Sequence, residues 1–333
     1  MTVTKTMLDA IAEHTVLSVD SMWPEGSLAI KPAKYFDNAT SNQFHIWYMF
    51  NKKPELIQEA IACVKKFTAV KESDKEEFIQ EVINYAAALL GKGMLEVVSG
   101  HCLTQTNPSF AYDTTKTVAS AVAFMKAYED LGVPKDKVII KIPTTFEGLK
   151  AIQELTTVYG IKTLGTMIHS LPQAIAAAEA GAFAISTYVD ELAANLDTSL
   201  LKEYDDLEEN YGWALTRDVH YYYRAYGVKT LNVAAAMIGA GVTIGLAGID
   251  GMTIPIPCLE MLAKMPAPVD FKPRMPKVVT PEEAPAKETY VDDKEKFNTA
   301  VFSNKMAKFR IEDAIATFVE YDGRTRKMIA DVL

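Results

Sequence analysis

The sequence of 333 residues has only three cysteines, no long apolar run and no excess of positive charge. Cys63, Cys102 and Cys258 lie far apart and are odd in number, which argues against a disulfide framework or a zinc site and indicates a reducing compartment. Because no stretch of about 18 apolar residues occurs, we expect no membrane span. The formal net charge of −9 argues against nucleic acid or an anionic membrane as the main partner.

Residues 1–14 are mixed and polar, without the apolar segment of a secretory signal. Together with the cysteine usage, this predicts a cytoplasmic protein. The rest of the composition is ordinary for a folded chain, with 49% hydrophobic and 23% charged residues. The length lies within the range of one α/β barrel, so we expect a single domain that spans residues 1–333.

Short β-rich runs alternate with helical segments along most of the chain. The expected strands cover residues 15–20, 36–42, 94–99, 138–143, 163–168, 182–189, 230–236 and 252–256. Residues 100–113, rich in Thr, Asn and Pro, are expected to form a loop. Alternation of this kind is typical of parallel βαβ units, and about eight strands is the number in a closed (β/α)8 barrel.

The tail of the chain has a different pattern. Residues 266–294 include a run rich in Pro, Lys and Glu and are predicted to be a surface linker. Residues 295–333 are helical in pattern and are predicted to dock on the barrel as a C-terminal helical segment. The side chains expected on its docking face are Phe309, Ile311, Ala314, Ile315 and Phe318.

Lys141 lies inside an apolar strand, with Ile140 before it and Ile142 after it. Strands of a parallel sheet are buried on both faces, so this lysine loses hydration and its charged form becomes costly. A desolvated amine with a lowered pKa is a nucleophile towards carbonyl groups. The alternative is a lysine at the strand end that extends to solvent or pairs with a carboxylate.

Other polar residues fall at the carboxyl ends of different predicted strands, where catalytic residues of barrels gather. They are Asp20, Asn42, Glu96, Thr166 and Ser186. A lysine with carboxylates, an amide and hydroxyls suits carbonyl chemistry, because carboxylates move protons while the other groups hold hydroxyls and water. Each residue alone also has a structural explanation: a cap for Asp20, an ion pair for Glu96, and ordinary strand polarity for the two hydroxyls.

Several segments, in order along the chain, resemble the transaldolase family. They are Val19-Asp20, Ala39-Thr40-Ser41-Asn42-Gln43, Glu96-Val97, Lys141-Ile142-Pro143-Thr144-Thr145-Phe146-Glu147-Gly148, Thr166, Ser186, Ala247-Gly248-Ile249-Asp250 and Met328-Ile329-Ala330-Asp331. The resemblance covers nearly the whole chain. It implies a (β/α)8 barrel enzyme that acts on small ketose and aldehyde substrates, and it is compatible with a homodimer.

The resemblance also implies roles for the residues. Lys141 would form an imine with a ketone donor, and Asp20 would accept the hydroxyl proton whose removal triggers carbon–carbon cleavage. Glu96, with Thr166 and a water molecule, would shuttle protons during imine formation and hydrolysis. Asn42 and Ser186 would hold hydroxyls of a three-carbon dihydroxyacetone unit.

We expect neither a metal nor an organic cofactor. The histidines lack metal-like spacing, and only His101 is singled out, because its loop departs from the family pattern. Residues 239–245 imitate a dinucleotide fingerprint, but the third glycine comes one place late and no acid follows at the right distance.

Two departures from the family concern its phosphate-binding arginines. One would fall in residues 186–191, which end in Glu191, and the other in residues 234–239, which contain no cation. Tyr188 replaces the usual phenylalanine; it is either a core aromatic or, as in related fructose-6-phosphate aldolases, a group that acts in protonation.

These departures predict an altered subsite, with Glu191 and Tyr188 facing the substrate, and a non-standard, non-phosphorylated substrate in a specialised biosynthetic pathway. Two alternatives stay open. The chain could be a housekeeping transaldolase of the pentose phosphate pathway whose phosphate cations come from elsewhere, or a non-catalytic barrel that only binds its ligand.

Overall fold

Eight parallel strands form a closed barrel in the computed structural model, which describes residues 5–333. Residues 1–4 lie outside the described residues. They belong to the N-terminal segment predicted to lack a secretory signal and to the domain predicted to span residues 1–333. The strands are β1 Val16–Asp20, β2 Asn38–Thr40, β3 Cys102–Gln105, β4 Val138–Pro143, β5 Thr163–Ile168, β6 Ala184–Tyr188, β7 Leu231–Ala235 and β8 Gly251–Pro255. They follow one another around the barrel in chain order, and β8 pairs with β1 to close it. The predicted (β/α)8 barrel is therefore confirmed.

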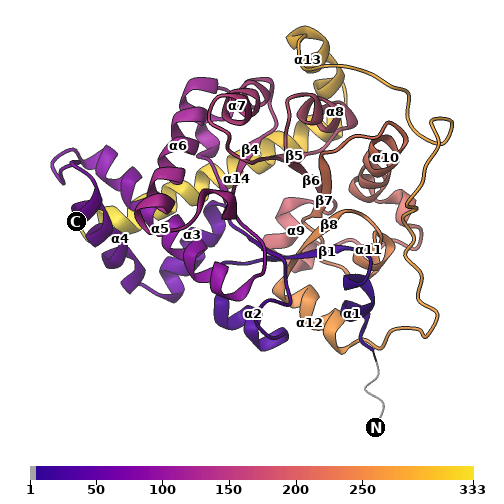
Figure 1. The fold of residues 1–333 in the computed structure, drawn as a ribbon, viewed down its shortest axis with the longest axis horizontal. Coiled ribbons are helices and arrows are strands. Elements are labelled where there is room, and N and C mark those ends of the chain that lie inside the picture. Colours follow the sequence, from indigo (N-terminus) through magenta and orange to yellow (C-terminus); the bar gives the residue numbers. More distant parts are fainter. Residues whose placement is uncertain (1–4) are drawn as a thin grey trace.

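Helices surround the barrel, with the strands in the middle of the molecule (Figure 1). The helices are α1 Met7–Ala12, α2 Pro24–Ile30, α3 Gln43–Lys52, α4 Glu55–Phe67, α5 Lys75–Val97, α6 Thr114–Asp130, α7 Phe146–Thr157, α8 Leu171–Glu179, α9 Leu192–Leu196, α10 Tyr211–Ala225, α11 Ala240–Gly245, α12 Ile256–Lys264, α13 Lys294–Phe302 and α14 Lys305–Ala330. None of the helices within the described part of the chain is both long and apolar enough to cross a membrane.

The expected strand over residues 94–99 is wrong. Helix α5 continues to Val97, and β3 begins at Cys102, inside the segment expected to be a loop. Gly91 lies within this helix, at the point where Tyr128 of α6 packs against it. A Cβ atom on Gly91 would lie 2.1 Å from the Tyr128 hydroxyl oxygen, so this glycine allows close helix packing and does not end the helix.

Gly91→Ala should lower the free energy of unfolding by about 1–3 kcal/mol, because the buried Tyr128 has no free space in which to move. Its hydroxyl already bonds the Thr104 hydroxyl at 2.7 Å. The matched control is Gly93→Ala two residues later, where the nearest atom to an added Cβ is 3.9 Å away. Gly93→Ala should raise the free energy of unfolding by roughly 0.5–1 kcal/mol, because alanine has a higher helix propensity than glycine. Urea unfolding measures both, and equal effects would contradict the packing argument.

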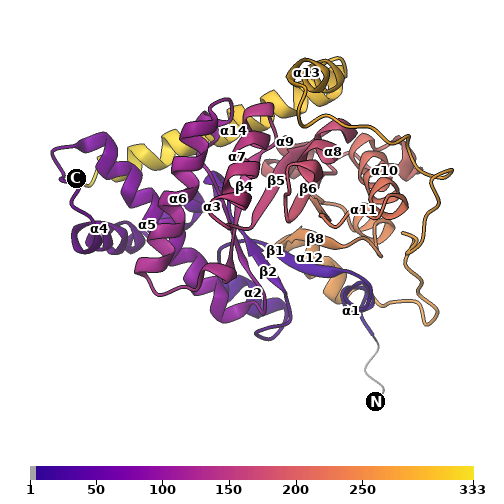
Figure 2. The ribbon, with the colours of Figure 1, turned by 45° about the horizontal axis from the view of Figure 1, so that its top comes forward.

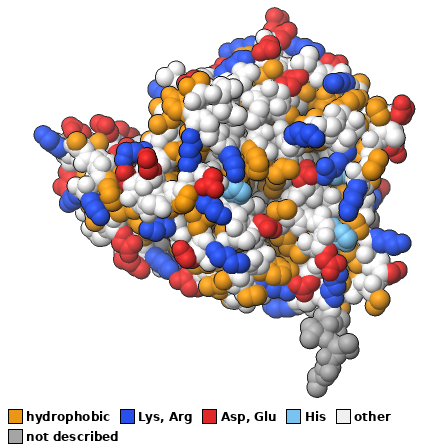
Figure 3. Space-filling model, viewed as in Figure 1, with side chains coloured by type: hydrophobic (Ala, Val, Ile, Leu, Met, Phe, Trp, Pro, Cys, Tyr) orange, Lys and Arg blue, Asp and Glu red, His pale blue; other side chains and the backbone are white. Residues whose placement is uncertain are grey.

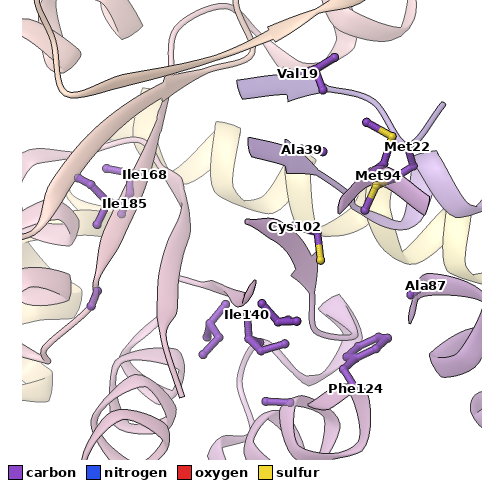
Figure 4. Close-up of a cluster of buried hydrophobic side chains, with 14 of the residues drawn as sticks. Val19, Met22, Ala39, Ala87, Met94, Cys102, Phe124, Ile140, Ile168 and Ile185 are labelled. Carbon is purple, nitrogen blue, oxygen red and sulfur yellow. The ribbon is translucent and has the colours of Figure 1, made fainter. Parts of the chain in front are cut away.

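The outward faces of the strands form the main core with the helices (Figure 4). Ile140 of β4 points towards the α6 residue Phe124, and Val19 of β1 lies near Met22 in the same cluster. A second, separate cluster consists of Leu103, Ile139, Leu164 and Ala184. Because neighbouring residues on a strand face opposite sides, the outward position of Ile140 places Ile139 and Lys141 inside the barrel.

The tail runs along the outside before it returns to the barrel. Between α12 and α13 the chain is an extended coil that passes α10 (Figure 1, Figure 2), and no named helix or strand lies within it. Helix α14 then packs against α3 and α5. Its residues Ile311, Ala314 and Phe318 are buried, whereas Phe309 is 57% exposed and does not belong to the docking face on which it was expected.

Candidate active site

A layer of polar side chains lies inside the barrel, next to its apolar interior cluster and nearer the carboxyl ends of the strands. Each residue of the inner cluster on β3 to β6 is followed, two positions later on the same strand, by a polar residue. These residues are Gln105, Lys141, Thr166 and Ser186. Because the side-chain period of a strand is two, all four share the inner face near the carboxyl ends of the strands.

Lys141 is only 5% exposed. Its Nζ donates hydrogen bonds to the Thr40 hydroxyl at 3.0 Å and to the Ser41 carbonyl at 3.2 Å. Burial lowers the pKa of the amine to about 8, and the nearby Asp20 carboxylate acts in the opposite direction. A substantial fraction of the amine is therefore neutral near physiological pH, as attack on a carbonyl carbon requires.

A cavity of about 430 Å³ opens above this lysine at the carboxyl end of the barrel. Of the residues predicted for the site, five line it: Asp20, Asn42, Lys141, Ser186 and Tyr188. They come from three strands, β1, β4 and β6, and from the cap of helix α3, so the barrel brings together residues far apart in the sequence. Thr166 does not line the cavity but lies behind Tyr188, whose hydroxyl is 3.1 Å from the Thr166 hydroxyl.

Asp20 and Asn42 are placed by neighbouring elements. Asp20 is the last residue of β1, in register with Pro255 at the end of β8. Asn42 caps helix α3, and its side-chain oxygen accepts a hydrogen bond from the His45 backbone N–H at 3.2 Å. Since the cap uses the oxygen, the amide N–H groups of Asn42 stay available as donors.

Glu96 is not near the lysine. It lies on the exposed side of α5, outside the cavity wall, because residues 94–97 are helical. The residue of β3 that pairs in register with Lys141 is Gln105, and its amide donates to the Gln43 side-chain oxygen at 2.7 Å. An amide does not titrate, so Gln105 positions polar groups without exchanging protons.

Glu191 also lies off the cavity wall. Its carboxylate is 3.2 Å from Lys202 Nζ and 3.7 Å from a guanidinium nitrogen of Arg310 on α14. Arg310 in turn donates to the Val189 carbonyl at 3.3 Å. The structure therefore places Glu191 in an ion-pair cluster behind the site.

His45 is a cavity residue that the sequence did not predict. Its Nε2 lies 3.6 Å from an Asp20 carboxylate oxygen, and its Nδ1 is buried without a hydrogen-bond partner among residues 5–333. Burial holds the pKa of the imidazole below its ordinary value, and Asp20 partly offsets that effect. His101, singled out instead, contacts Asn38 and Lys162 away from the cavity. His45 was missed because the sequence pattern did not predict helix α3, which places His45 in the site.

Imine formation at Lys141 should accelerate with pH up to about 8–9 and then level off, because only the neutral amine attacks a carbonyl. Below pH 7 the rate should change roughly tenfold per pH unit. The measurement mixes protein with dihydroxyacetone at each pH and quenches with borohydride at timed intervals. Nα-acetyl-lysine treated identically gives the reference for an unperturbed amine. A rate that keeps rising beyond pH 10 would contradict the lowered pKa.

A closed (β/α)8 barrel with a buried lysine and an aspartate at its carboxyl end is an arrangement suited to enzymes that act on carbonyl compounds. The family model described as Transaldolase/Fructose-6-phosphate aldolase matches residues 17–327. A transaldolase from Gibberella intermedia is 31% identical over 84% of this chain and 85% of its own, and one from Yersinia pseudotuberculosis is 31% identical over 84% of each. Transaldolase NQM1 of Saccharomyces cerevisiae is 31% identical over 73% of this chain and 72% of its own.

The chain therefore belongs to the transaldolase/fructose-6-phosphate aldolase family, as the sequence resemblance predicted. It is an enzyme of the aldolase-like transferase type. Among solved structures, an IMP dehydrogenase/GMP reductase-like protein from Corynebacterium glutamicum matches with a TM-score of 0.43 and 13% identity, over 74% of this chain and 66% of that one.

Proposed function

We propose that the chain makes or transfers a dihydroxyacetone-type three-carbon unit through an imine on Lys141, with a non-phosphorylated substrate and in a specialised biosynthetic pathway. The observation that supports this most is the charge in the cavity. Among the described residues that line it, only Lys141 and Asp20 are charged, and no arginine is present. The site thus contains an amine nucleophile and a base, but its wall has no further cation that could bind a phosphate group.

In the proposed reaction, neutral Lys141 attacks the donor ketone and forms an iminium. The Asp20 carboxylate takes the proton of the hydroxyl on the carbon to be cleaved, the carbon–carbon bond breaks, and its electron pair moves towards the iminium nitrogen to give an enamine. Asn42 amide N–H groups and the Ser186 hydroxyl bind hydroxyls of the three-carbon unit.

The proton transfers around the imine need a group other than Glu96, which lies on the outer helix α5. We assign them to Tyr188, which lines the cavity and whose hydroxyl lies 3.1 Å from that of Thr166. Burial raises the pKa of Tyr188 above its ordinary value, so the phenol keeps its proton and is available as a donor. Thr166 then orients the phenol, which is consistent with its position behind the cavity wall.

No guanidinium group belongs to the cavity wall among the described residues. Arg310, the arginine beside the segment after β6, does not line the cavity. One of its guanidinium nitrogens lies 3.7 Å from Glu191 and another donates to the Val189 carbonyl, while its Nε has no hydrogen-bond partner among residues 5–333. A charged hydrogen bond to phosphate is worth roughly 1.5–3 kcal/mol, and the cavity wall supplies none from arginine. Acidic and basic side chains are interspersed on the face in Figure 3, without a broad patch of one sign among the described residues there.

A housekeeping role is the alternative that the relatives favour, since both are transaldolases by name. A coupled assay with fructose 6-phosphate and erythrose 4-phosphate decides between the two. We expect no turnover of this pair, while dihydroxyacetone and borohydride label Lys141, as located by peptide mass mapping. Turnover of the phosphorylated pair would establish the alternative, and failure to label Lys141 with any carbonyl compound would overturn the proposal.

A further inference from the structure

The wall of the cavity beyond Lys141 and Asp20 is mostly apolar. One group of side chains comes from the segments after β1 and β2: Trp23, Phe44 and Tyr48. Another comes from the segments after β6 and β7: Leu192, Leu196 and Ile238. Since β2 and β6 are four strands apart in a closed ring of eight, the two groups face each other across the opening. Pro255 at the end of β8, with Ile256 and Pro257 directly after it, completes the rim on a third side.

Three cations lie near this rim without belonging to the cavity wall, and each contacts another group of the protein. Lys52 Nζ lies 3.6 Å from the centre of a Trp23 ring, in a cation–π contact. Lys202 pairs with Glu191, and so does the buried Arg310. A phosphate placed here would lose hydration without gaining a partner, which is unfavourable. A hydrocarbon group placed here would leave water and contact apolar atoms, which is favourable.

We infer that this rim binds the hydrocarbon part of an apolar aldehyde, of about phenyl or short alkyl size, which accepts the three-carbon unit from Lys141. The inference rests on the proposed function, because it needs the enamine on Lys141 as the attacking group. The cavity of about 430 Å³ is within the usual range for small-ligand sites. The three-carbon unit occupies the polar floor beside Ser186, and the acceptor occupies the space above it.

The reaction balances without an oxidant or a reductant. With dihydroxyacetone as the donor, the iminium on Lys141 first loses a proton from the adjacent carbon to the Asp20 carboxylate, which gives the enamine. The enamine carbon then attacks the aldehyde carbon, so one carbon–carbon bond forms while the carbonyl π electrons move to the aldehyde oxygen. That oxygen takes the proton held by Asp20. Water then hydrolyses the iminium on Lys141, which releases a hydroxyketone with an apolar substituent and restores the free amine.

The test compares acceptors with dihydroxyacetone as the donor. Phenylacetaldehyde and hexanal should exceed both glyceraldehyde and glyceraldehyde 3-phosphate by at least about tenfold in kcat/KM. Along the series propanal, butanal, pentanal and hexanal, kcat/KM should rise by up to about fourfold per methylene, which corresponds to roughly 0.8 kcal/mol of burial for each. The rise should come from KM, because added methylenes bind without touching the reacting atoms.

Two lysine variants in the segment after β6 distinguish an effect at the cavity rim from a general effect of added surface charge. Leu196 lines the cavity and is 39% exposed, whereas Leu200 is 53% exposed and lies outside the wall. Leu196→Lys should lower kcat/KM for hexanal by about tenfold and raise it for glyceraldehyde 3-phosphate, because it places a cation on the rim. Leu200→Lys should leave both values as in the wild type.

The possible outcomes distinguish the inference from the proposed function. Labelling of Lys141 with preference for apolar aldehydes supports both. Labelling with preference for glyceraldehyde overturns the apolar rim but leaves the proposed function standing. Labelling with preference for the phosphorylated aldehyde overturns the rim and the non-phosphorylated substrate together. Absence of labelling with every carbonyl compound overturns the proposed function itself. Equal responses of the two lysine variants overturn the assignment of Leu196 to the rim.

Discussion

Replacing Lys141 by methionine should remove aldol turnover, with a loss on the order of 10³-fold or more, because no other group can supply the covalent intermediate. Methionine has nearly the length of lysine but no amine, so the space is kept while the nucleophile is lost. The free energy of unfolding should not fall, since the folded protein no longer buries an amine whose pKa is lowered by desolvation. Turnover of dihydroxyacetone with an aldehyde, intact mass after borohydride, and thermal unfolding measure the three effects.

A control lies at the other end of the same strand. Lys137 immediately precedes β4, and its Nζ is 3.4 Å from the Ser99 carbonyl, away from the cavity. Lys137→Met should keep turnover and labelling at wild-type levels. Full turnover by Lys141→Met would contradict the imine mechanism. If neither the wild type nor the control becomes labelled, a barrel that only binds its ligand is the better explanation.

The sequence predicted most of the barrel because burial leaves a strong pattern on its strands. The segments around Lys141, Thr166 and Ser186 are short apolar runs between helices that end at glycines, and the structure has β4, β5 and β6 there. The prediction for residues 94–99 was wrong because their composition is strand-like, whereas helix α5 runs on to Val97 and packs against α6 at Gly91. Contacts between elements, which a local pattern does not contain, decided that boundary.

The candidate site was predictable to the extent that strand ends converge. Asp20, Lys141 and Ser186 follow from the rule that catalytic groups gather at the carboxyl end of a barrel, and the structure places all three on one cavity. Glu191 is drawn away by Arg310, which lies 119 residues later on α14. Such a long-range ion pair leaves no trace in a local motif.

His45 and Gln105 were missed for a related reason. Each is positioned by an element that the sequence pattern did not reveal, α3 for His45 and β3 for Gln105. Strand β3 begins at Cys102, six residues after Glu96. The residue of β3 that lies beside Lys141 is therefore the amide Gln105 and not the carboxylate Glu96. The position of this one strand thus decides which group is available for proton transfer. With an amide at this position, we assign the proton transfers around the imine to Tyr188.

Asp20→Asn should separate imine formation from carbon–carbon chemistry. Turnover should fall by about 10²–10⁴-fold, because an amide cannot accept the hydroxyl proton during cleavage or return it during addition. Labelling of Lys141 by dihydroxyacetone and borohydride should persist. It should even become faster near pH 7, because the Asp20 carboxylate raises the pKa of Lys141 and its removal lets that pKa fall further below about 8.

The measurement pairs steady-state turnover with timed labelling on the same preparations. Asp136→Asn serves as the control, because Asp136 is exposed just before β4 and far from the cavity wall, so both rates should match the wild type. Loss of labelling in Asp20→Asn, with the fold intact by circular dichroism, would mean that Asp20 acts in imine formation and not in the proton transfer that follows. Retained turnover would move the base role to another group, and His45, 3.6 Å from the same carboxylate, would be the first residue to test.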